Sequence, residues 1–95
     1  MADAARVVSA LESFDSWHAP WTFMQVVRAP PHLDADDRVV LEQAWTAAGH
    51  ADHWMSARML EAGVAAAESA LSKRFGWLSP LACRQLARAA SYEWR

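Results

Sequence analysis

The chain has 95 residues, 54% of them hydrophobic and 21% charged, and a net charge of −2. Its single cysteine, Cys83, excludes an intramolecular disulfide and suits a reducing compartment. The longest uncharged run, residues 16–27, is too short to cross a bilayer. We therefore expect a cytoplasmic protein without membrane contact. Because alanine is abundant and glycine and proline are few, we expect residues 1–95 to form one helical domain.

The first predicted element is a helix that begins after Asp3. The apolar residues after it recur at helical spacing, and Asp3 is a suitable N-cap. We expect this helix to end near Asp15 and Ser16. The apolar stripe consists of Ala4, Val7, Val8, Leu11 and Phe14.

The segment 20–28 permits two interpretations. Pro20 fits the first position of a short helix, and Pro30 with Pro31 would stop it. The segment is also rich in residues that favour strands, such as Trp21 and Val26, although the chain has no second strand-like run to pair with it. We favour a short buried helix, with a strand added to another molecule as the alternative.

The next predicted helix begins at the N-cap Asp34 and has an acidic first turn. Gly49 then lies where a left-handed glycine often ends a helix, which predicts a break before the following element. The apolar face of this helix is formed by Val40, Leu41, Ala44, Trp45 and Ala48.

One long helix over about 52–75 is predicted to organise the fold. Lys73 and Arg74 lie near its end, where the helix dipole favours cations, and Gly76 follows as a candidate left-handed terminator. A last helix begins at Ser79 and Pro80. We expect its inward face to contain Leu81, Ala82, Leu86, Ala87, Ala90 and Trp94. The sequence thus predicts an all-α bundle of four to five helices.

Six tryptophans are more than so small a core can bury, and tryptophan is enriched where proteins meet. We therefore expect a tryptophan- and methionine-rich contact surface. Our candidate anchors are Trp17, Trp21 and Trp54, and Arg84 and Arg88 are the candidate charged rim. The predicted function is a non-enzymatic protein-interaction module (an inhibitor, adaptor or phage-type accessory factor) that docks on a larger protein or forms a homodimer.

The alternative function is a DNA- or RNA-binding regulator that uses the last helix. Residues 71–95 contain five basic residues and one acidic residue, whereas residues 1–70 are acidic overall. Such a cluster could contact phosphates, although the rest of the chain would repel them. The basic residues are Lys73, Arg74, Arg84, Arg88 and Arg95.

No pattern in the sequence indicates catalysis. His50 and His53 have the spacing of two metal ligands on a helix, but no third ligand follows at a familiar spacing. Cys83 lies among alanine and leucine, which favours a buried, unreactive thiol. Glycine-rich phosphate loops and dinucleotide-binding patterns are absent from the sequence. We therefore expect no enzyme activity, no cofactor and no bound metal.

Overall fold

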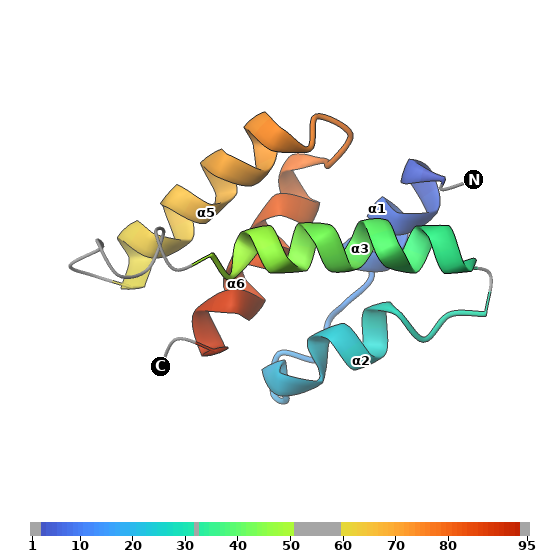
Figure 1. Ribbon diagram of the computed structural model, residues 1–95. Coiled ribbons are helices and arrows are strands. Elements are labelled where there is room, and N and C mark those ends of the chain that lie inside the picture. Colours follow the sequence, from blue (N-terminus) through green and yellow to red (C-terminus); the bar gives the residue numbers. More distant parts are fainter. Residues whose placement is uncertain (1–2, 32, 51–59, 94–95) are drawn as a thin grey trace.

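The computed structural model describes residues 3–31, 33–50 and 60–93 (Figure 1). Within these ranges the chain is helical, and no strand occurs. The predicted all-α bundle is therefore confirmed. The described elements are α1 (Ala4–Glu12), the short 3-10 helix η1 (Pro20–Thr22), α2 (Phe23–Val27), α3 (Ala35–Ala48), α5 (Leu60–Arg74) and α6 (Pro80–Glu93).

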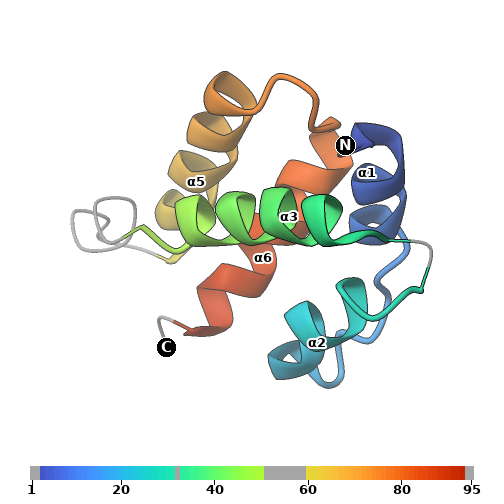
Figure 2. The same cartoon turned by 45° about the vertical axis from the view of Figure 1, so that its right-hand side comes forward.

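The centre of the bundle is α6 rather than the long helix expected to organise it. α6 passes behind α3 and makes contacts with α1, α3, α5 and η1, whereas α5 packs mainly on α6 and α3 (Figures 1 and 2). The start predicted for the long helix, near residue 52, lies outside the described residues. Both views place α2 at the end of the molecule away from α5.

Helix N-termini form where the sequence predicts them. The Asp3 carboxylate accepts hydrogen bonds from the backbone N–H groups of Ala5 and Arg6, and so caps α1. Asp34 and Asp37 form a reciprocal capping box at the start of α3. The Ser79 hydroxyl accepts a hydrogen bond from the Ala82 N–H, 3.1 Å away, at the start of α6. Each cap satisfies backbone donors that a helix leaves unpaired.

The segment 20–28 is also helical, so the strand alternative does not describe it. Pro20 is buried at the first position of η1, and α2 continues directly from this turn to Val27. The end predicted for α1 was three residues too late, because α1 ends at Glu12 with Ser13 as its C-cap. The Ser13 hydroxyl donates to the Ser9 carbonyl oxygen, which closes the last turn.

Neither predicted glycine stop has the left-handed conformation. Gly49 follows α3 as expected, but its φ of −87° is in the ordinary range. Positive φ angles do not occur at any described glycine, including Gly76. The break after α3 is confirmed, while the physical reason given for it is wrong. The chain leaves these helices through right-handed turns that other residues also adopt.

Large buried side chains from all these helices meet in one core. Its most enclosed members include Leu11 of α1, Phe23 of α2, Leu41 of α3, Leu71 of α5 and Leu86 of α6. The predicted inward face of α6 is correct except at Leu81, which is 43% exposed in the first turn, and at Trp94, which lies outside the described residues. The periodic apolar stripes therefore locate the core well.

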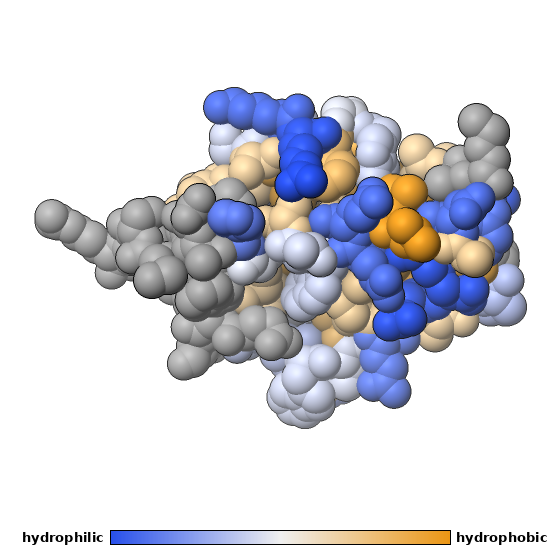
Figure 3. Space-filling view, in the orientation of Figure 1, coloured by the Kyte–Doolittle hydropathy of each residue, from blue (hydrophilic) through white to orange (hydrophobic). Residues whose placement is uncertain are grey.

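The face seen in Figure 3 is mostly hydrophilic over α3 and has a small apolar patch toward the N-terminal half of that helix, where Val39 is 52% exposed. Among the described residues, no helix has the length and apolar character needed to span a membrane.

Candidate protein-binding surface

Trp17 is held in place by other rings. Its indole lies edge-on to Phe14, with ring centroids 4.8 Å apart, and is stacked at 6.0 Å on Phe23 and at 6.4 Å on Tyr92. The guanidinium carbon of Arg88 lies 4.0 Å from the centroid of the same indole. Cation–π and aromatic contacts at these distances are favourable. Trp17 is therefore a half-buried part of the fold as well as a surface residue.

The loop that carries Trp17 is fixed from α6. The Gln85 side-chain amide, which is buried, donates a hydrogen bond to the Phe14 carbonyl oxygen over 2.8 Å. A buried backbone oxygen without this partner would be costly. The bond thus positions the start of the segment that leads from α1 through Trp17 to η1.

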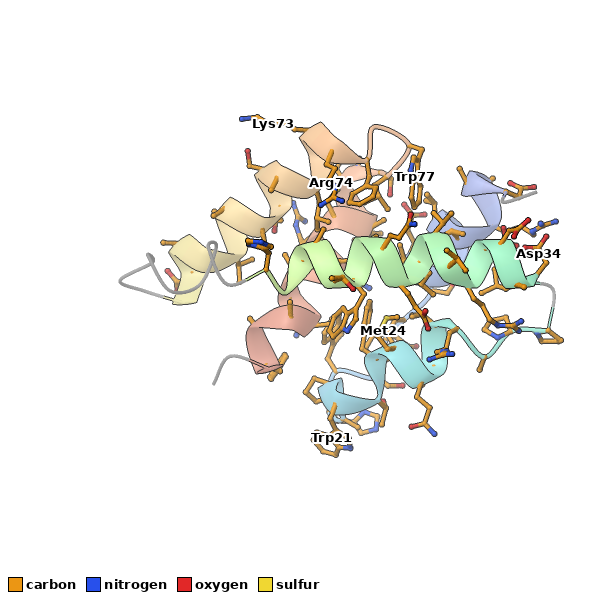
Figure 4. The ribbon with its side chains drawn as sticks, viewed as in Figure 1. Trp21, Met24, Asp34, Lys73, Arg74 and Trp77 are labelled. Atoms are coloured by element: carbon orange, nitrogen blue, oxygen red, sulfur yellow. The ribbon has the colours of Figure 1, made fainter. Side chains whose placement is uncertain are left out.

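Trp21 is the large apolar side chain most exposed in the described part of the chain. It is 73% exposed, in the middle of η1, and its ring points away from the body of the protein (Figure 4). The turn beneath it is well anchored, because Pro20 is buried and the Thr22 hydroxyl donates to the Ala19 carbonyl oxygen over 2.7 Å. A rigid turn thus holds a large ring in solvent.

We call Trp17, Trp21, Arg88 and Tyr92 the Trp21 surface. η1 packs against α6, the helix that carries Arg88 and Tyr92, and Trp21 follows Trp17 by four residues. Arg88 is exposed, and Trp17 and Tyr92 are half-buried. Tryptophan, tyrosine and arginine are the residue types that contribute most often to binding energy at protein interfaces. Three of its residues, Trp17, Trp21 and Arg88, are among the candidate partner-binding residues from the sequence.

Two other candidate binding residues lie elsewhere. Arg84 lies one helical turn before Arg88 on α6 and lines a groove between α5 and α6 together with Glu68. Trp54 lies outside the described residues. Met24, a methionine of the segment before Pro30, is half-buried against the core.

The basic residues of the alternative function are divided between two sides of α5. Arg74 lies over the Phe75 ring, 5.2 Å from its centroid, and lines a groove with α3. Arg84 lines the groove on the opposite side of α5, where Ser69 and Ser72 face it. Lys73 is exposed, and Arg95 lies outside the described residues. The described cations therefore do not form one continuous patch.

The described residues do not bring together three metal-ligating side chains. His50 follows α3 and is exposed, whereas His53 lies outside the described residues. Cys83 is 3% exposed, and its pKa is raised, first by burial and then by the nearby Glu68 carboxylate. A raised pKa disfavours the nucleophilic thiolate at neutral pH.

A buried ion-pair network at the starts of α1 and α3 was missed from the sequence. The Asp37 carboxylate, fully buried, accepts hydrogen bonds from the Asp3 N–H at 2.6 Å, the Asp34 N–H at 3.1 Å and the Arg6 Nε at 2.9 Å. Despite the opposing effect of burial, these bonds lower the pKa of Asp37 from 3.8 to about 2, and the bond from the Asp3 backbone contributes most. The network joins α1 to α3 and is structural.

The chain matches no protein-family model, no curated protein sequence and no solved structure.

Proposed function

We propose that the chain is a non-enzymatic protein-interaction module that docks on a larger protein through the Trp21 surface. An inhibitor, an adaptor or a phage-type accessory factor would act in this way. The observation that carries the proposal is the 73% exposure of Trp21 on an anchored turn. Tryptophan is enriched at protein interfaces and among the residues that contribute most to binding energy there.

The free energy gained when a partner buries the Trp21 ring supports the proposal. A tryptophan buries roughly 150–250 Å² when it is enclosed, so a partner that covers Trp21 removes about 150 Å² from water. At about 25 cal/mol per Å² this contributes roughly 4 kcal/mol, which is typical of a residue that dominates an interface. Because η1 is already ordered, little conformational entropy is lost when Trp21 is covered.

The positive charge over the neighbouring Trp17 favours a partner with an acidic rim. Arg88 is exposed and fixed over Trp17, so a carboxylate on the partner would meet an oriented guanidinium. The single cysteine supports a cytoplasmic setting for this interaction.

The experiment uses the full chain, immobilised, with Trp21→Ala and Val39→Ala as variants. Val39 is the matched control, because it is 52% exposed and lies on α3 rather than on η1 or α6. Proteins retained from the native host are identified, and the affinity of the best candidate is then measured in purified form. We expect Trp21→Ala to weaken this affinity at least 30-fold and Val39→Ala to change it less than threefold. Equal binding by all three proteins would contradict the proposal.

The nucleic-acid alternative is tested in the same samples. If it holds, DNA or RNA binds at low salt, and Arg84→Ala and Arg88→Ala each weaken that binding and reduce its salt dependence. Unchanged migration of both nucleic acids would exclude it. Only the exposure of Arg84 and Arg88 on α6 favours this alternative.

A further inference from the structure

A groove of about 360 Å³ lies between α5 and α6. Its α5 wall carries three exposed short side chains at helical spacing, Ala65, Ser69 and Ser72. Its floor includes Leu78 and the buried Cys83. Short side chains along one wall allow another helix to approach closely.

The two walls of this groove carry opposite charges. Glu68 lines the α5 wall of the groove, and Arg84 lines its α6 wall. Among the described residues, neither side chain forms an ion pair. Glu68 lies six residues before the end of α5, and Arg84 lies four residues after the start of α6. Measured along the helices from the turn that joins them, Glu68 therefore lies at about 9 Å and Arg84 at about 6 Å, which is nearly the same height.

We infer that the groove between α5 and α6 binds the same groove of a second copy of this chain. A two-fold axis that runs along the groove places the α5 wall of one copy opposite the α6 wall of the other. Glu68 of each copy then faces Arg84 of its mate, so that two crossed ion pairs form. The exposed Leu81, one turn before Arg84, is covered at the edge of the same contact. Because the groove carries both charges, the same groove of a second copy is complementary to it, and we therefore infer a second copy as the occupant.

The area of the face formed by α5 and α6 indicates a weak dimer. α5 and α6 have 15 and 14 residues, which gives a face about 22 Å long and about 20 Å wide. The projected area of roughly 440 Å² is below the roughly 800 Å² per partner of a standard stable interface. An interface of this size is typical of weak, transient association, so the dimer should be reversible. It does not involve the Trp21 surface and is independent of the proposed function.

Sedimentation equilibrium of the full chain over about 1 µM to about 1 mM tests the inference. We expect the mass to rise from 10.6 kDa toward twice that value. Glu68→Arg and Arg84→Glu should each weaken association at least tenfold, because two like charges then face each other. The double variant Glu68→Arg/Arg84→Glu should restore it. Lys73→Glu, an exposed charge reversal on α5 that does not line the groove, is the matched control and should not alter the mass.

Circular dichroism checks that each variant retains its helices. A mass of 10.6 kDa at every concentration overturns the inference, and so does a double variant that stays monomeric while folded. If Glu68 and Arg84 only interact within one copy, the reversals change thermal stability and leave the mass unchanged, which also overturns it. Trp21→Ala should dimerise like the wild type, so a failure of the proposed function is distinguishable from a failure of the dimer.

Discussion

Replacing Trp17 and Trp21 one at a time by alanine should separate a ring that stabilises the fold from a ring that does not. Trp17 contacts Phe14, Phe23 and Tyr92 and lies under Arg88, whereas Trp21 is 73% exposed. Truncation of a fully buried tryptophan costs about 3–5 kcal/mol. Because Trp17 is half-buried, we expect a loss of about 2–3 kcal/mol for Trp17→Ala. For Trp21→Ala we expect a change within about 0.5 kcal/mol, as for other exposed positions.

Urea unfolding followed by far-ultraviolet circular dichroism measures both effects. With a slope of roughly 1 kcal/mol/M for a small domain, the midpoint should fall by about 2–3 M for Trp17→Ala and by less than about 0.5 M for Trp21→Ala. The slope should stay the same in both variants. Two results would refute the reasoning: equal losses of stability in the two variants, or a Trp17→Ala protein as stable as the wild type.

Two further predictions concern the helix starts. The pKa of Asp37 is lower in the folded protein (about 2) than its ordinary value of 3.8, so its contribution to stability is complete above pH 3.8 and is lost as pH falls toward 2. Asp37→Asn should therefore lower the unfolding midpoint at pH 7 and weaken the dependence on pH between 4 and 2, in urea titrations at each pH. A midpoint unchanged at pH 7 would contradict the network. Ser79→Ala removes the α6 cap and the hydrogen bond to Glu12, and should cost about 1–2 kcal/mol in the same assay, whereas Ser79→Thr, which keeps the hydroxyl, should retain most of both interactions.

The features that the sequence predicted correctly depend on neighbours along the chain. Asp3, Asp34 and Ser79 cap their helices because a cap needs only its own side chain and the next three residues. The buried positions of the helices followed from the spacing of apolar residues. The exposure of Leu81 shows the limit of this argument, because its neighbours Ala82 and Cys83 in the same turn are buried.

The features that it missed depend on residues far apart in the chain. Arg6 and Asp37 are 31 residues apart, and only the packing of α1 against α3 brings them together. In the same way, the composition predicted that some tryptophans would be exposed without showing which. Trp17 is covered because Phe23 and Tyr92 reach it from α2 and α6, and Trp21, four residues later, has its ring in solvent.

The hydrogen bond from Gln85 to Phe14 has a consequence for the order of events during protein synthesis. It connects residues 71 positions apart, and the Ser79 hydroxyl donates to Glu12 across 67 positions. The segment 13–19 therefore cannot complete its contacts until α6 has been synthesised, although Phe14 and Trp17 can already contact Phe23. Formation of these long-range contacts should therefore be slower than formation of the individual helices.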